Sequence, residues 1–299
     1  MGSIRNKIKT KSLKQQFTDA ARQANGAYKT VHHRQIIMER LRQYLKVHNI
    51  QIKAIDQMKV IYIEGYVHSR LGQGISRRTL QNELAAIRQT LRAVGRVKLA
   101  DHSRLTNQAL GISGASRQGT KVAITQKQYQ AIHQLAFNKS PALAATLDVA
   151  ITLGLRGEEA VQSYKSMQTW QKALQKGQTR IQVVFGTKGG RPREVYIINP
   201  QKTLQVVNNA LAMMQQQNGK LIDKPNLKQA MNYWRNSTSR LGLTGEHSPH
   251  CLRYAFTQHQ IDHYLKQGYS EPEALAKASM DLGHGDGRGR YIKQVYGLK

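Results

Sequence analysis

The 299-residue sequence contains one cysteine, few acidic residues and no long hydrophobic run. The single cysteine, Cys251, excludes an intramolecular disulfide and any cysteine-rich zinc module, and it predicts a reducing, cytoplasmic compartment. The most hydrophobic stretch, 143–155, is short and is interrupted by Asp148, so it predicts a core helix rather than a membrane span. The N-terminus carries no visible targeting signal. We therefore expect a cytoplasmic protein that has no membrane partner.

The shortage of acidic residues leaves a large positive charge. Lys and Arg number 46 against 17 Asp and Glu, a formal net charge of +29. Residues 1–112 hold 21 basic and 6 acidic side chains, and residues 113–299 hold 25 and 11, so the excess is not confined to a tail. Binding to phosphates releases condensed counterions, which makes nucleic acid the leading partner. A solubilising surface, a ribosomal-type binder and a binder of anionic membranes also fit the charge alone.

The N-terminal half shows the apolar spacing of helices. The segment 4–25 predicts a basic amphipathic arm, 31–47 and 56–70 predict helices, and Ser76 can cap a further helix that runs to Val94. Residues 112–121 are small, polar and basic, as in a flexible connector. We expect a helical DNA-binding domain over 1–112, a linker over 113–121 and a second domain over 122–299.

The second half predicts a mixed domain. Helices are expected over 125–137, 142–152, 204–216, 228–241 and 253–267, with an extra turn and helix over 269–276 and a last helix from Arg290. Two β-branched stretches, 180–184 and 193–198, flank a Gly189-Gly190 turn and predict a hairpin. The predicted fold class is mainly α with a small β-sheet (α+β).

Two short contexts in the second domain contain basic side chains that could contact a DNA phosphate. In the first, Arg156 follows the apolar helix, and Glu159 lies one turn later, where it could orient the guanidinium. In the second, Lys188 lies on the glycine-containing hairpin turn, from which its ammonium could reach DNA and release a proton. Taken alone, each is also typical of a surface ion pair or a basic turn.

Two later contexts add histidines and tyrosines. The spacing of three between His250 and Arg253 predicts that both lie on one side of a helix near its positive end. His284 follows a glycine. Tyr291 and Tyr296 lie close to the chain end, where a tyrosine could be carried by a mobile segment or could be an ordinary aromatic residue that packs against its neighbours.

In this order, the contexts resemble the signature of the tyrosine recombinases, the family of phage integrases and Xer-type resolvases. The four motifs that carry the resemblance read GLRGEEA, TKGGRPR, PHCLRYAF and DLGH. The resemblance covers about residues 122–299, and the helical bundle before it matches the family's core-binding domain in placement only. It implies that the second domain is catalytic.

The resemblance also implies a role for each site residue. Arg156 and Arg253 would bind the non-bridging oxygens of the scissile phosphate, and Lys188 would protonate the leaving 5′ oxygen. His250 would assist proton transfer, and His284 would donate a hydrogen bond to the phosphate. Glu159 would support the geometry of the site. No cofactor and no metal are then required.

The nucleophile would be a tyrosine that forms a 3′-phosphotyrosyl link. The family's usual spacing from the Gly-His histidine falls between Tyr291 and Tyr296, which lie seven and twelve residues after His284. We favour Tyr296, because Gln294-Val295-Tyr296 resembles the end of the family's last motif and because Gly285, Gly287 and Gly289 indicate an inserted loop. Tyr291 stays the alternative.

The expected partner is double-stranded DNA that carries a specific recombination site, bound by a homotetramer with or without accessory DNA-bending proteins. The side chains expected to face DNA are Arg77, Arg78, Arg191, Arg193, Arg288, Arg290 and Lys293. Two other functions fit the same residues: a type IB topoisomerase that relaxes DNA without exchanging partners, and a non-catalytic DNA-binding protein on the same fold.

Overall fold

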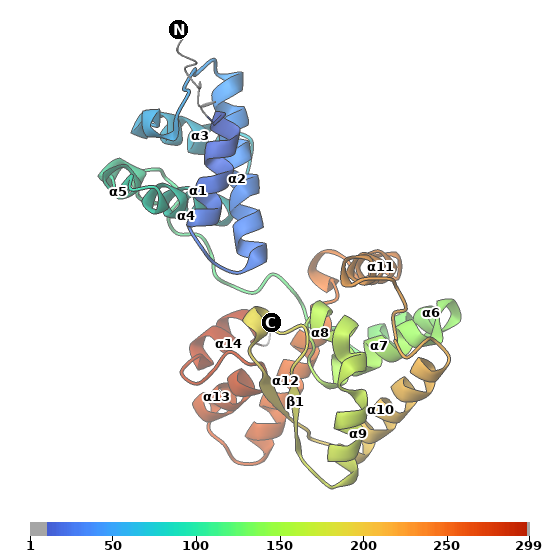
Figure 1. Cartoon of the computed structure of the whole chain (residues 1–299). Helices are drawn as coiled ribbons and strands as arrows, with labels where there is room; N and C mark the ends of the chain where they lie inside the picture. Colours follow the sequence, from blue (N-terminus) through green and yellow to red (C-terminus); the bar gives the residue numbers. More distant parts are fainter. Residues whose placement is uncertain (1–10, 298–299) are drawn as a thin grey trace. The chain divides into compact units, whose positions relative to one another are not determined.

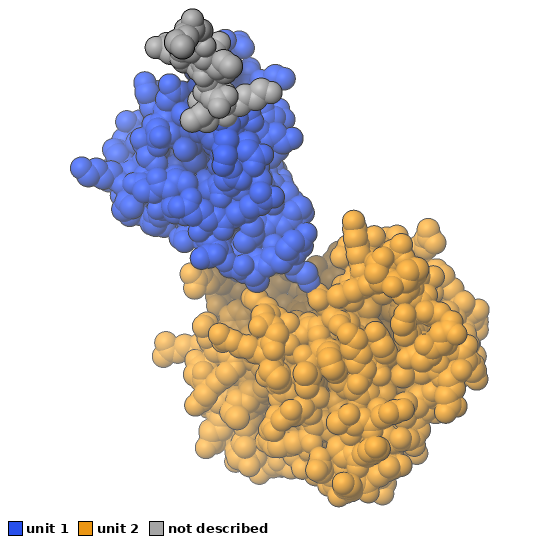
Figure 2. Space-filling view, in the orientation of Figure 1, with its two compact units in different colours: residues 1–116 blue, residues 117–299 orange. Residues whose placement is uncertain are grey.

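The computed structural model describes residues 11–297, which fall into two compact units: unit 1 ends at Ser116 and unit 2 begins at Arg117 (Figure 2). The boundary between the units lies inside the segment 113–121 that the composition predicts as a linker. The part of the predicted N-terminal arm that falls on residues 4–10 lies outside the described residues. Among the described residues, no helix is both long and apolar enough to cross a membrane.

Unit 1 is a helical bundle (Figure 1). Its helices are α1 (Leu13–Gln23), α2 (Tyr28–Val47), α3 (Val60–Gly72), α4 (Arg77–Ala93) and the short α5 (Val97–Ala100). Single 3₁₀ turns lie at Ile55–Gln57 and Ser103–Leu105. The predicted cap of α4 is confirmed, because the Ser76 hydroxyl accepts a hydrogen bond from Thr79 N. The core is made of the apolar stripes of these helices, as the periodicity predicts.

One buried carboxylate joins three of the helices of unit 1. Glu83 of α4 accepts hydrogen bonds from the Tyr66 hydroxyl (2.7 Å) and the Arg70 guanidinium (2.8 Å) of α3, and from Arg40 of α2. A buried charge is tolerated when it is paired and fully hydrogen-bonded. This cluster therefore fixes how α2, α3 and α4 pack while leaving Arg40 partly exposed.

Unit 2 is built around a hydrophobic helix, α7 (Pro141–Thr152), which α6 (Gln126–Lys139), α10 (Pro200–Gln215) and α12 (Cys251–Lys266) surround. The remaining helices are α8 (Gly157–Gln162), α9 (Met167–Gln175), α11 (Leu227–Arg240), α13 (Glu271–Asp281) and α14 (Gly289–Tyr296), and 3₁₀ turns lie at Ser163–Lys165, Lys188–Gly190 and Gly245–His247. The predicted cap of α6 is confirmed, since Thr125 Oγ1 accepts from Gln128 N.

The hairpin predicted in unit 2 is present. Strand β1 (Arg180–Val183) pairs antiparallel with β2 (Arg193–Tyr196), so that Val183 faces Arg193 and Arg180 faces Tyr196. Strand β2 also contacts α13, which brings the hairpin next to the C-terminal helices (Figure 1). The predicted fold class, mainly helical with a small sheet, is confirmed.

Candidate active site

The first arginine of the site begins a helix. Gly154 turns the chain after α7 with a positive φ of 58°, and Arg156 is the N-cap of α8. The Glu159 carboxylate accepts one hydrogen bond from Arg156 N (2.9 Å) and another from Arg156 Nη1 (2.6 Å). The contact expected between these two residues is therefore present, and it holds the guanidinium at the start of the helix.

Arg156 and Arg253 meet, although nearly a hundred residues separate them in the sequence. Arg156 Nη2 lies 3.3 Å and Arg253 Nη2 lies 2.6 Å from the same acceptor, the carbonyl oxygen of Leu282. Arg253 also donates to Gly154 O. The Arg253 side chain is buried, and its Nε has no hydrogen-bond partner among the described residues.

The negative charge of Glu159 offsets part of the positive charge of these arginines. Burial alone would raise the pKa of Glu159, but the charges and hydrogen bonds of Arg193, followed by Arg253 and Arg156, lower it to about 2. Burial and the neighbouring arginines in turn lower the pKa of Arg253. The site thus holds three guanidinium groups around one ionised carboxylate and has an excess of positive charge that suits a phosphate.

The two histidines flank the arginine pair. His250 directly precedes α12, on the same end of the helix as Arg253, and His284 follows the turn at Gly283. Burial first, and then the charges of Arg253 and Arg156, lower the pKa of both imidazoles to about 4. Both are therefore neutral near pH 7 in the free protein. The buried Nε2 of His284 has no partner among the described residues, so it can serve a ligand.

Both candidate tyrosines lie on α14, but they face different surroundings. The Tyr296 hydroxyl lies 3.5 Å from His250 Nε2, and the side chain is 2% exposed. Tyr291 is 37% exposed, and its ring centroid lies 5.1 Å from that of His284. Tyr296 is thus the tyrosine whose hydroxyl the structure places next to a proton acceptor of the site.

Lys188 lies on the exposed turn between the two strands. Gly189 and Gly190 follow it with φ values of 72° and 71°, a left-handed conformation that glycine adopts without strain. The charge of Lys188 is among the causes that lower the pKa of His284, so the turn is near the site.

Six of the side chains expected to face DNA are exposed: Arg77, Arg78, Arg191, Arg288, Arg290 and Lys293. Lys293 pairs with Glu271 at 2.9 Å, which leaves both groups accessible on the surface. The prediction for Arg193 is wrong. This residue is 5% exposed, because position 193 shares the inward face of β2 with Val195. Both its Nη1 and its Nη2 donate hydrogen bonds inside unit 2, while its buried Nε has no partner among the described residues.

The sequence reasoning missed a second carboxylate beneath the site. Asp281 is buried and accepts hydrogen bonds from the Tyr264 hydroxyl (2.7 Å), Tyr196 N (3.1 Å) and Gln260 Nε2 (3.2 Å). It joins β2, α12 and the end of α13 just before His284. No local sequence pattern around Asp281 reveals these partners, which lie 17 to 85 residues away in the sequence.

The segment that leads from unit 1 into unit 2 packs against the tyrosine helix. Gly119 N donates to Gln294 O at 3.2 Å, and a Cβ at position 119 would lie 1.9 Å from Val295 O and 2.6 Å from the Tyr254 hydroxyl. Only glycine fits such an approach. The later part of the expected linker is therefore ordered against α14.

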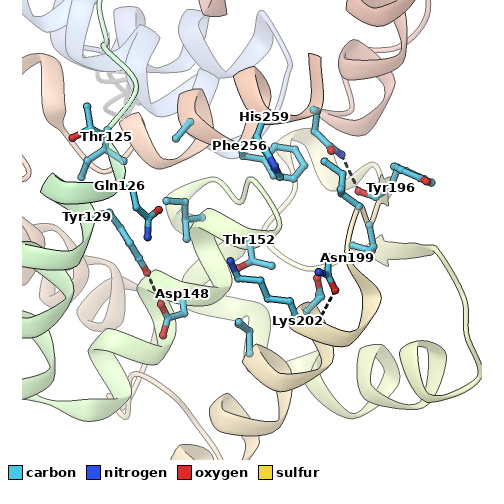
Figure 3. Close-up of a pocket in the computed structure, with 18 residues that line it drawn as sticks. Thr125, Gln126, Tyr129, Asp148, Thr152, Tyr196, Asn199, Lys202, Phe256 and His259 are labelled. Atoms are coloured by element: carbon cyan, nitrogen blue, oxygen red, sulfur yellow. Dashed lines mark hydrogen bonds between the residues drawn. The ribbon is translucent and has the colours of Figure 1, made fainter. Parts of the chain in front are cut away.

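A separate pocket of about 500 Å³ lies elsewhere in unit 2 (Figure 3). Tyr129 and Asp148, which share a hydrogen bond of 2.6 Å, line one side, and Lys202 and Asn199 from the start of α10 line another. None of the residues expected in the active site lines this pocket. Nor do residues 11–297 contain a group of three or more His, Cys, Asp or Glu side chains that could hold a metal ion.

Family models match residues of both units. A family model described as integrase matches residues 111–259, and one described as phage integrase, N-terminal, matches residues 10–100. The first match ends before His284 and both tyrosines. No curated protein matches the sequence.

Solved structures share the fold at low sequence identity. The Tn1549 transposon integrase in complex with a circular intermediate DNA has a TM-score of 0.60 and 14% identity, over 95% of both chains. A lambda integrase tetramer bound to a Holliday junction has a TM-score of 0.56 and 15% identity, over 95% of this chain and 80% of that chain. XerH site-specific recombinase bound to its palindromic difH substrate has a TM-score of 0.56 and 15% identity, over 94% and 80%. With both family matches and this shared fold, the chain belongs to the phage integrase family, the tyrosine recombinases.

Proposed function

We propose that this protein is a site-specific DNA recombinase that cleaves and rejoins DNA strands through a 3′-phosphotyrosyl intermediate. The observation that carries the proposal is the convergence of Arg156 and Arg253 on Leu282 O beside the contact between the Tyr296 hydroxyl and His250. Two guanidinium groups and a phenol held together in this way suit attack on a phosphodiester.

In the cleavage step, the Tyr296 oxygen attacks phosphorus, and its proton passes to His250, which is neutral near pH 7. The bond between phosphorus and the 5′ oxygen breaks, and Lys188 supplies the proton that this leaving oxygen needs. Arg156 and Arg253 stabilise the charge that grows on the non-bridging oxygens. The tyrosyl ester conserves the energy of the broken phosphodiester bond. The 5′ hydroxyl of another strand can therefore attack this ester, and the proton transfers at His250 and Lys188 then run in reverse.

The expected partners follow from this chemistry. Exposed arginines on both units would bind the backbone of a duplex that carries the target site. A homotetramer would bring the cleaved strands together, with accessory DNA-bending proteins where the site must be bent; the lambda integrase that shares the fold is a tetramer bound to a Holliday junction.

The test traps the covalent intermediate. Full-length protein is incubated, in EDTA, with a pool of duplexes that carry a nick beside a randomised segment, so that cleavage near the nick releases a short fragment and prevents religation. Denaturing capture of the protein, followed by sequencing of the attached strand, gives the cleavage site. We expect an adduct that transfers its strand to an added complementary 5′-hydroxyl strand.

Two outcomes would support the other functions. Relaxation of supercoiled DNA of any sequence, with no exchange between two sites, would indicate a type IB topoisomerase. Tight binding to a selected site without any adduct from the wild-type protein would leave a non-catalytic DNA-binding protein.

A further inference from the structure

We propose that Arg193 is a positioning residue that holds the catalytic groups of three separate chain segments in register; this inference rests on the proposed function. Arg193 lies on β2, the strand that follows the turn with Lys188. Because its side chain is 5% exposed, a DNA phosphate cannot reach it.

The first segment held by Arg193 contains the start of α8. Arg193 Nη2 lies 2.9 Å from Glu159 Oε2 and also donates to Leu153 O (3.3 Å) and Gly154 O (3.2 Å). Glu159 Oε2 also accepts from Arg156 N. The carboxylate is thereby fixed so that its other oxygen faces the Arg156 guanidinium.

The second segment is the end of α13, which leads to His284. Arg193 Nη1 donates to Asp281 O at 2.6 Å. A Cβ on Gly283 would lie 2.8 Å from Arg193 Cδ and 2.9 Å from its Cβ, so the arginine stem packs directly against this glycine. The carbonyl between them, Leu282 O, is the shared acceptor of Arg156 and Arg253. Arg193 therefore fixes both that carbonyl and the turn that presents His284.

The third segment is the start of α12, which Arg193 reaches through a shared acceptor. Gly154 O accepts from Arg193 Nη2 and from Arg253 Nη1. The two terminal nitrogens of the planar Arg193 guanidinium thus donate to acceptors on two different turns, Nη1 to Asp281 O and Nη2 to Gly154 O. An ammonium group cannot reproduce this geometry. A lysine would keep the positive charge but would lose the two paired donor nitrogens of the guanidinium.

The main test compares Arg193→Lys with Arg180→Lys, a matched change at an exposed arginine of the same hairpin that begins β1 and pairs with Glu194. We measure single-turnover adduct formation on the trapped site, the Kd for the intact site and the Tm. For Arg193→Lys we expect the cleavage rate to fall about 100-fold, because misplaced catalytic groups carry costs of this size, while the Kd stays within about twofold of wild type. Arg180→Lys should cleave at the wild-type rate. Cleavage by Arg193→Lys at the wild-type rate would overturn the proposal.

A second variant separates positioning from folding. Arg193→Met removes the guanidinium that lowers the pKa of Glu159 most, so the pKa of that carboxyl rises and the cleavage rate gains a dependence on pH that wild type lacks. The double variant Arg193→Met with Glu159→Gln removes both charges and should lose that pH dependence. An identical pH profile in all three proteins, or a loss of cleavage matched by loss of Tm and binding, would contradict a positioning role.

A readout without cleavage distinguishes this proposal from the proposed function. The imidazole NMR signals of His284, assigned with His284→Gln, should shift in Arg193→Lys and stay in place in Arg180→Lys. If the wild-type protein forms no adduct, the proposed function fails, while the His284 signals still decide the role of Arg193. Unmoved signals in Arg193→Lys would overturn it.

Discussion

The guanidinium groups of Arg156 and Arg253 share one acceptor, the carbonyl oxygen of Leu282. Two like charges at one point are costly unless an anion lies between them, and Glu159 supplies only one negative charge. The pair is therefore preorganised for a second anion.

Replacing Arg156 with alanine should slow adduct formation by about 10²–10³-fold, the loss typical when one preorganised donor to a transition-state oxyanion is removed. Site binding should weaken far less, because many other cations contact the backbone. Arg290→Ala, at an exposed arginine of α14, is the control. Equal losses in the two variants would mean that Arg156 serves only general affinity for DNA.

The nucleophile can be identified directly, because Lys293 separates the two tyrosines. Trypsin divides this region into Tyr291-Ile292-Lys293 and Gln294-Val295-Tyr296-Gly297-Leu298-Lys299. Mass spectrometry of the trapped adduct should find the nucleotide remnant on the second peptide. Tyr296→Phe should abolish the adduct and keep binding, and Tyr291→Phe should retain it. The reverse pattern would assign the reaction to Tyr291.

Lys188→Ala should lose most cleavage of ordinary DNA, because the leaving 5′ oxygen needs a proton. A substrate in which sulfur replaces that bridging oxygen has a leaving group that needs no proton. We therefore expect the variant to recover on the sulfur substrate to nearly the wild-type rate, in single-turnover assays. Lys293→Ala is the matched control and should treat both substrates as wild type does. A Lys188→Ala defect of equal size on both substrates would exclude the role of general acid.

Stability should depend on pH through His250 and His284. Their pKa values are lowered from 6.5 to about 4 in the folded protein, by burial and by Arg253 and Arg156. The unfolded chain therefore takes up protons first, so the stabilisation is complete above about pH 6.5 and is lost as the pH falls toward 4. Tm measured between pH 7 and 4.5 should drop less in His250→Gln and in His284→Gln than in wild type. Parallel curves would show that folding lowers the pKa of neither imidazole.

Gly119→Ala should impair cleavage without touching a catalytic group. The added methyl would collide with Val295 O, and overpacking of this kind costs about 1–3 kcal/mol. We expect α14 to shift and the rate of adduct formation to fall at least about tenfold, with DNA binding kept. Thr120→Ala, at the exposed next residue, should behave as wild type. A wild-type rate for Gly119→Ala would mean that α14 does not depend on this contact.

Most helices of the fold could be predicted from apolar spacing and caps, with ends that differ by a few residues. The predicted helix 56–70 begins later, at Val60, because residues 55–57 form a 3₁₀ turn first. Helix α9 was missed although Met167, Trp170 and Leu174 have helical spacing and are buried. Short helices such as α8 carry too few periodic positions to stand out.

The site could be anticipated as an ordered set of motifs, but not its internal support. Glu159 and Arg193 form an ion pair across 34 positions of sequence, and no local pattern reveals such a partner. The inward orientation of Arg193 could nevertheless be predicted, because the apolar residues Val195 and Ile197 follow it at alternate positions, and both are buried. A basic side chain in an apolar alternation is better interpreted as a buried partner than as a DNA contact.

The hydrogen bond from Gly119 to Gln294 has a mechanical consequence. The peptide chain that tethers unit 1 passes along the main chain of α14, two residues from Tyr296, before it reaches the first helix of unit 2. A force on that segment would therefore act first on α14, which bears Tyr296. If the proposed function holds, DNA binding by unit 1 would act on the position of Tyr296 through this stretch of backbone.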